Sequence, residues 1–238
     1  MTAENEGPDR GDTGVLNADL YPDLVKLGGL ASALIHASQE NGIELGRVRP
    51  GSGSKEAEFV SAASDSDRGS ALINLGVDRR WFSISIENDV HSWASGGTDD
   101  IVSTVKMLDA WRRGVTLQEL NTLFPYMHFD EMAQAYETGD PVATQWNQLL
   151  TDGDPFFSQA LLQKIHSNDR LRTLFPFLSH GTLRLARDHT DRTAGEIWIT
   201  PLRAGGHRVE STTPGEQEKI IEPFDQLIEA AVEFLDRP

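Results

Sequence analysis

The sequence predicts an α+β protein with two antiparallel β-meanders flanked by helices, and a helical insert between the meanders. Short segments with the period-2 alternation of half-buried strands gather in two groups, around 57–95 and 181–212. Segments with apolar residues at helical spacing lie on both sides of the first group and at the end of the chain. Helical patterns interrupted by Gly and Pro fill the interval around 128–173.

The first predicted helix lies in the segment LYPDLVKLGGLASALIHASQENG. Pro22 is suited to a helix start, and Gly42 to a helix end. The pair Gly28-Gly29 is unfavourable inside a helix. We therefore expect this pair to permit the close approach of another part of the backbone.

A first group of four strands is predicted next, with the clearest alternation in the third of them. Its residues Phe82, Ile84 and Ile86 alternate with polar positions, which is typical of an antiparallel strand. The short turns between the strands contain Asp or Gly and favour hairpins. The four segments are AEFVSAA (57–63), SALINLG (70–76), WFSISIE (81–87) and VHSWAS (90–95).

Two helices follow this group of strands. The first, in TDDIVSTVKMLDAWRRG, has Thr98 as its predicted N-cap and ends at Gly114. The second is shorter, with Thr116 as its predicted cap and Pro125 as its stop.

The remaining chain completes a predicted organisation of four parts, which could also be fused into one domain. The strands GTLRLARD (181–188), GEIWITPLR (195–203) and HRVEST (207–212) precede an amphipathic terminal helix. The predicted parts are a disordered acidic tail (1–18), an N-terminal α-β-meander-α unit (19–125), an acidic helical insert (126–170) and a C-terminal β-meander-α unit (171–238).

A short motif occurs twice, in LNTLFPYMHF from Leu120 and in LRTLFPFLSH from Leu171. The two copies do not occupy matching places relative to the strand groups, so a tandem duplication is disfavoured. We interpret both as helix ends, where Leu and Phe anchor the last turn and proline stops the helix.

The composition restricts the function classes. The net charge of −16 argues against general nucleic-acid binding and against anionic membrane surfaces. No Lys or Arg occurs between Arg113 and Lys164, which indicates either a solvated acidic face or a docking surface for a basic partner. The N-terminal segment has no basic start and no apolar stretch, and no run approaches a membrane span, so we expect a cytoplasmic protein.

The sequence contains no recognised catalytic or phosphate-binding motif. It has no cysteine, no Gly-x-Ser-x-Gly, and in GSGSK (51–55) no Walker spacing. The seven histidines never fall as His-x-x-x-His. We therefore expect no metal site and no cofactor.

One segment, FLSHGTLRLARD, carries candidate site residues. In an extended chain, His180, Thr182 and Arg184 share one face, while Leu183 and Leu185 point into the core. The guanidinium would favour the neutral imidazole, so the row with His180 and Arg184 could bind a carboxylate or phosphate, or provide a general base for acid–base chemistry. Ser179, Thr182 and Trp198 are candidate ligand-binding residues on this surface; the alternative is an ordinary polar outer face.

Three stretches resemble an actinomycete family of unknown function whose members are labelled natural-product biosynthesis proteins. They are LYPDLVKLGGLASAL, TDDIVSTVKMLDAWRRGVTLQEL and LRTLFPFLSHGTLRL. The chain departs from the family pattern at Phe175, Leu178 and Gly181, where that pattern has Tyr, Thr and Trp. The matching positions are Thr98, Asp99, Asp100, Ala110, Trp111, Gly114, Leu171, Arg172, Leu174, Pro176, Phe177, Ser179, His180, Leu183 and Arg184.

The resemblance implies an accessory or tailoring protein in the biosynthesis of a natural product, in particular a modified ribosomal peptide. Such a protein would bind a precursor peptide or a partner enzyme. Two alternatives stay open: an acid–base enzyme of the cyclase or lyase type that uses His180 and Arg184, and a non-catalytic immunity-like or chaperone-like binding module. The oligomeric state does not follow from the sequence.

Overall fold

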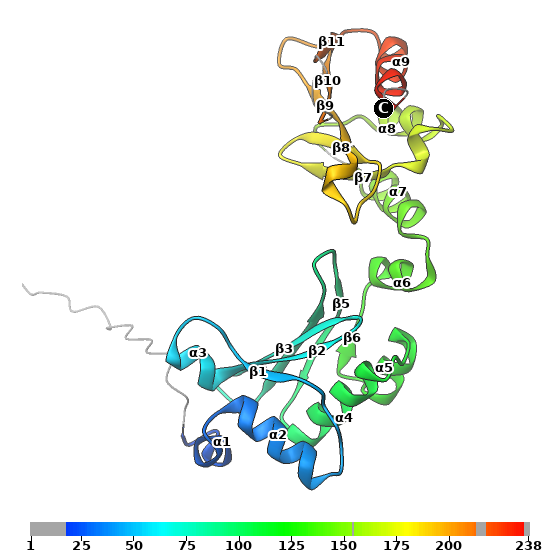
Figure 1. Ribbon diagram of the computed structural model, residues 1–238. Coiled ribbons are helices and arrows are strands. Elements are labelled where there is room, and N and C mark those ends of the chain that lie inside the picture. Colours follow the sequence, from blue (N-terminus) through cyan, green and yellow to red (C-terminus); the bar gives the residue numbers. More distant parts are fainter. Residues whose placement is uncertain (1–17, 154, 213–217, 236–238) are drawn as a thin grey trace, which may run out of the picture. The chain divides into compact units, whose positions relative to one another are not determined.

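The structure is a computed structural model that describes residues 18–153, 155–212 and 218–235. All but the last residue of the predicted N-terminal tail lies outside these ranges. The chain divides into two compact units, Met1–Asp130 and Glu131–Pro238, and each unit is described by itself. Each contains one antiparallel sheet with its own helices (Figure 1), which makes the protein α+β as predicted.

The first unit is built on a six-stranded sheet in which every strand pairs with its neighbour along the chain. In β4 the side chains of Phe82, Ile84 and Ile86 are buried, whereas Ser83 and Glu87 are exposed, which confirms the predicted alternation. The strands are β1 Val48–Pro50, β2 Ser61–Ser66, β3 Gly69–Leu75, β4 Phe82–Glu87, β5 Ser92–Thr98 and β6 Met127–His128.

Helices α2 and α4 pack against each other and against one face of this sheet (Figure 1). The N-cap of α4 is Asp100, whose carboxylate accepts hydrogen bonds from the backbone N–H groups of Val102 and Ser103. The prediction of Thr98 as the cap is wrong by two residues, whereas Thr116 caps α5 as predicted. Glu119 completes a capping box with Thr116. The helices of this unit are α1 Pro22–Leu27, α2 Leu30–Glu40, α3 Lys55–Val60, α4 Ile101–Arg112 and α5 Leu117–Leu123.

The predicted strand at 57–63 is wrong over its first half, which forms helix α3. Ser54 caps this helix by accepting a hydrogen bond from the N–H of Ala57, and β2 begins only at Ser61. Phe59 of α3 packs on Gly29, where an added Cβ would lie 3.1 Å from the Cα of Phe59. The close backbone approach predicted for the glycine pair is therefore confirmed at Gly29, whereas an added Cβ at Gly28 would meet no atom within 4 Å.

The second unit has a five-stranded sheet with the order β11-β10-β9-β8-β7. The helices predicted as an insert belong to this unit. Its strands are β7 Phe175–Ser179, β8 Thr182–Ala186, β9 Glu196–Pro201, β10 His207–Ser211 and β11 Lys219–Ile221, and its helices are α6 Glu131–Thr138, α7 Pro141–Asp152, α8 Gln159–His166 and α9 Phe224–Leu235, with 3₁₀ turns at Leu171–Thr173 and Arg192–Ala194.

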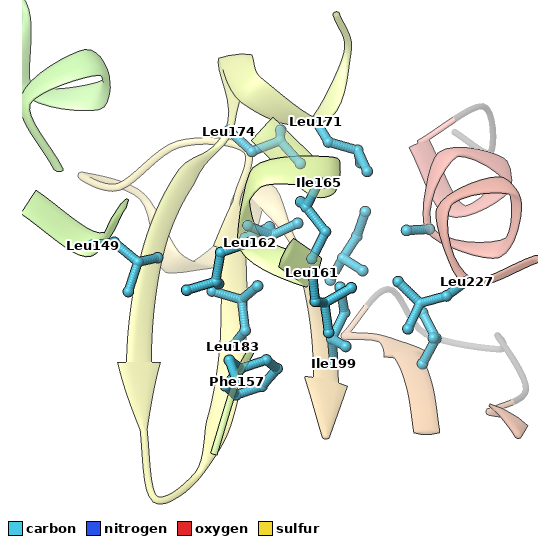
Figure 2. Close-up of a cluster of buried hydrophobic side chains, with 14 of the residues drawn as sticks. Leu149, Phe157, Leu161, Leu162, Ile165, Leu171, Leu174, Leu183, Ile199 and Leu227 are labelled. Carbon is cyan, nitrogen blue, oxygen red and sulfur yellow. The ribbon is translucent and has the colours of Figure 1, made fainter. Parts of the chain in front are cut away.

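One face of this second sheet packs against α7, α8 and α9 to form the core of the unit. Leu161, Leu162 and Ile165 of α8 point towards Leu183 of β8 and Ile199 of β9, and all five are buried (Figure 2). Trp146 of α7 is fully buried as well, and its indole Nε1 donates a 3.0 Å hydrogen bond to the carbonyl of Leu174. The opposite face of the sheet is therefore the one left for polar side chains.

The interpretation of both motif copies as helix ends holds for one copy only. The first copy ends α5 at Leu123, but the second contains a single 3₁₀ turn and then β7. Pro176 lies inside β7, which is an edge strand, and an edge tolerates a residue without an N–H donor. Pro176 therefore belongs to an edge strand and does not end a helix.

The described helices are short, with 12 residues in α4, α7 and α9. None of the helices in this part of the chain combines the length and apolarity that a membrane crossing requires.

Candidate functional site

The second sheet carries a mixed aromatic and polar surface on the side opposite its core. Ile197 and Ile199 of β9 face the core and are buried, so Trp198 and Thr200 face the other way and are only partly buried. We call this surface the outer face. It consists of Phe177 and Ser179 of β7, Thr182 and Arg184 of β8, Trp198 and Thr200 of β9, Arg208 and Glu210 of β10, and Ile220 of β11.

Arg184 lies in the middle of the outer face, between two aromatic rings. The strand register places it opposite Phe177 on one side and opposite Trp198 on the other. Its guanidinium carbon lies 4.5 Å from the ring centre of Phe177 and 4.7 Å from that of Trp198. Both distances are within the range of cation–π attraction.

Glu196, two residues before Trp198 in β9, holds this arrangement in place. Its side chain is 6% exposed. Its Oε2 accepts hydrogen bonds from Arg184 Nε at 2.7 Å, from Arg184 Nη2, and from the indole Nε1 of Trp198 at 2.6 Å. One buried carboxylate oxygen therefore orients both the guanidinium and the indole.

A row of three hydroxyl groups, which ends at Arg208, runs across the outer face beside the aromatic row. The hydroxyl residues are Ser179, Thr182 and Thr200, and Arg208 lies opposite Thr200. The Oγ1 atoms of Thr182 and Thr200 are 3.0 Å apart. The row offers hydrogen-bonding groups to a ligand that lies across the strands.

His180 does not lie in the row that contains Arg184. It forms, with Gly181, the two-residue turn between β7 and β8, and its φ of 53° and the Gly181 φ of 74° are both positive. These values are typical of a type I′ hairpin turn, in which the side chain leaves the strand ladder. The prediction that His180 and Arg184 stand side by side on one extended strand is therefore wrong.

The surroundings of His180 are open to solvent. The side chain is exposed, and its Nδ1 is 3.0 Å from the Oγ of Ser179. Arg184, in contrast, directs Nε and Nη2 towards Glu196. The catalytic roles of His180 and Arg184 stay a prediction. The shared strand face on which that prediction was based is not present.

Sequence reasoning placed Thr182, Arg184 and Trp198 on this face but did not include Glu196, Phe177, Arg208 or Glu210. Glu196 has the same parity as Trp198 in β9, so the alternation of that strand contained the necessary signal. Phe177 could not be found in this way because it follows Pro176, which we interpreted as a helix stop, and no strand of the second group is predicted before residue 181. Arg208 and Glu210 have the same parity within β10, but their places beside Thr200 and Trp198 depend on the register.

Other candidate sites are weaker in the described part of the chain. No group of three or more His, Asp and Glu residues there is arranged to hold a metal ion. A cavity of about 340 Å³ in the first unit is lined by Arg49, Ser70 and Glu87 among others. Arg49 is held by two hydrogen bonds of 3.1 and 3.0 Å to Asp65, so it is not free to bind a ligand.

Comparison with known proteins gives one match. Residues 140–235 match a family of unknown function (DUF6193), a range that covers all of the outer face and the motif at 171–184. The two other stretches that carry the resemblance, which begin at Leu20 and Thr98, lie outside the matched residues. No curated protein and no solved structure matches the chain.

Proposed function

We propose that the protein is a cytoplasmic accessory or tailoring protein in natural-product biosynthesis, which binds a precursor peptide or a partner enzyme through the outer face. The single observation that carries this proposal is the stack of Phe177, Arg184 and Trp198, held in place by Glu196. The natural-product context comes from the family resemblance of the sequence.

The residue types on the outer face support binding to another polypeptide. Trp and Arg are enriched among the residues that contribute most to protein–protein affinity. Here both side chains are partly exposed and are already fixed in one orientation, so little side-chain entropy is lost when a partner binds. The hydroxyl row beside them could bond the backbone of an extended segment.

The charge of the protein favours a basic partner. The chain carries a net charge of −16, and Glu131, Glu137 and Asp140 of the second unit fall in the stretch without Lys or Arg. Such a field raises the rate of encounter with cationic partners and lowers it for anionic ones.

The acid–base alternative has less support from the site. A general base needs a substrate within hydrogen-bond reach in a setting that excludes water. His180 is exposed in a hairpin turn, and two nitrogens of Arg184 are directed to Glu196. We therefore assign the binding role, with His180→Ala as the variant that separates the two functions.

The test uses the full-length protein and the separately purified products of the genes that flank its own. We expect one of them to bind in isothermal titration calorimetry, and Trp198→Ala to weaken that binding at least tenfold. Ile35→Ser, at an exposed apolar position of the first unit, serves as the control. The proposal is overturned if none of the purified proteins or peptides binds. It is also overturned if His180→Ala retains binding but abolishes formation of the natural product of the pathway.

A further inference from the structure

We propose that the outer face binds an arginine or lysine side chain of its partner between the indole of Trp198 and the carboxylate of Glu210. This inference rests on the proposed function and names the chemistry of the ligand. It arises from the two neighbours that the strand register gives Trp198, which are Arg184 on one side and Glu210 on the other.

The two faces of the Trp198 ring have different neighbours. Arg184 of β8 lies over the ring with its guanidinium carbon 4.7 Å from the ring centre. On the other side, β10 places Glu210 directly opposite Trp198 in the register. A cation of the protein itself therefore covers the ring from the β8 side, and on the β10 side the neighbouring residue in the register carries a carboxylate.

The indole ring is fixed before any ligand arrives. Its Nε1 donates a 2.6 Å hydrogen bond to the carboxylate of Glu196, which restricts the rotation of the ring. A ring with a fixed orientation presents its negative π face without further ordering, and Trp is the best aromatic partner for a cation.

The carboxylate of Glu210 is available for a stronger partner than it has now. Its only ion pair within the described residues is with Arg208, whose Nε lies 3.8 Å away, beyond hydrogen-bond distance. Glu218 lies at the same distance of 3.8 Å from Arg208 Nη1. Glu210 and Glu218 thus share one arginine, at distances too long for hydrogen bonds, so the charge of Glu210 can attract an incoming cation.

The pair Arg184 and Glu196 shows the geometry that the ligand would adopt. In that pair a guanidinium lies on the indole and donates to a carboxylate of a neighbouring position. A ligand arginine between Trp198 and Glu210 would make the same two contacts on the opposite ring face. The result would be an alternating row of aromatic rings and cations across the sheet.

The experiment uses the ¹⁵N-labelled full chain and two capped hexapeptides, one of alternating arginine and threonine and one of alternating glutamate and threonine. The indole N–H resonance of Trp198 is assigned with Trp198→Phe. We expect the arginine peptide to shift this resonance, and Glu210→Gln to weaken the binding about tenfold, because a charge-assisted hydrogen bond is lost. Glu229→Gln, at an exposed position of α9, removes the same charge and should leave the affinity unchanged.

Three outcomes would overturn the inference: no shift of the Trp198 resonance, equal weakening by Glu210→Gln and Glu229→Gln, or tighter binding of the glutamate peptide. If the partner found by calorimetry binds the Glu210→Gln variant as well as the native protein but fails to bind Trp198→Ala, the proposed function stands and this inference fails.

Discussion

Arg80 and Asp23 form a bidentate ion pair that joins α1 to the turn between β3 and β4. The Nη1 and Nη2 atoms of Arg80 each donate a 2.8 Å hydrogen bond to one carboxylate oxygen of Asp23. The neighbouring Tyr21 accepts a 3.0 Å hydrogen bond at its hydroxyl from the backbone N–H of Trp81. The chain before α2 is thus fastened at two points to the turn between β3 and β4.

This ion pair should make the stability of the protein depend on pH in the acidic range. The hydrogen bond from Arg80 holds the pKa of Asp23 below its ordinary value of 3.8. A carboxyl group with a lowered pKa in the folded state stabilises the fold above its unfolded pKa, and that contribution is lost as the pH falls through the folded value. Since Asp23 is 46% exposed, we expect Asp23→Asn to lower the free energy of unfolding at pH 7 by only about 0.5–1 kcal/mol.

Urea denaturation between pH 7 and pH 2 checks this prediction. The difference in the free energy of unfolding between the native protein and Asp23→Asn should become smaller below about pH 4. Asp67→Asn, at an exposed turn position, is the control and should show no such narrowing. A difference that stays constant over the whole range would contradict the prediction.

Removing one partner of the pair Arg184 and Glu196 should lower the free energy of unfolding strongly. Replacing both partners by apolar residues should lower it much less. Glu196→Ala leaves a guanidinium that is 25% exposed without its carboxylate, and we expect a loss of about 3 kcal/mol in unfolding free energy. The double variant Arg184→Met/Glu196→Leu replaces both charges by apolar groups and should recover most of that loss. Chemical denaturation measures both, and a double variant no more stable than Glu196→Ala would refute the prediction. Partner binding should be lost in the double variant although stability returns.

The turn at His180 should accept a residue that favours positive φ. His180 has a φ of 53°, a value that asparagine adopts more readily than most residues at this position of a type I′ turn. We expect His180→Asn to raise the free energy of unfolding by about 0.5 kcal/mol, and His180→Val to lower it. Thermal unfolding tests the order Asn, His, Val. The reverse order would show that contacts of the imidazole outweigh the backbone preference.

Gly96 should not tolerate a side chain. A Cβ added there would lie 1.9 Å from the carbonyl oxygen of Tyr126, at the point where β5 pairs with β6. Since that atom is backbone, the two strands would have to separate, and we expect Gly96→Ala to cost about 2 kcal/mol. The exposed neighbour Ser95→Ala is the matched control. Similar stabilities of the two variants would contradict the steric argument.

The elements with several turns or a long alternation could be predicted from the sequence. Phe82, Ile84 and Ile86 recur at every second position, and Thr116 with Glu119 forms a capping box that can be read from residue types alone. These patterns are local, so no knowledge of the rest of the fold is needed. The fold class followed from them.

The edge strands could not be predicted in this way. Strands β1, β6 and β11 have only two or three residues, too few to show a period. Strand β7 was obscured by Pro176, whose helix-stopping role was the more common interpretation. The meeting of Arg184 with Glu196 depends on the register of β8 against β9, which is set by tertiary packing.

Every sheet pairing within the described residues joins strands that are consecutive in the chain. Apart from the β5–β6 pairing, which encloses α4 and α5, each pairing closes only a short connection, so little chain entropy is lost before the first native contacts form. Proteins with such local contacts fold faster than β-rich proteins with distant pairings. Because the two sheets are encoded one after the other, the β1–β6 sheet can assemble on the ribosome before the β7–β11 sheet has been synthesised.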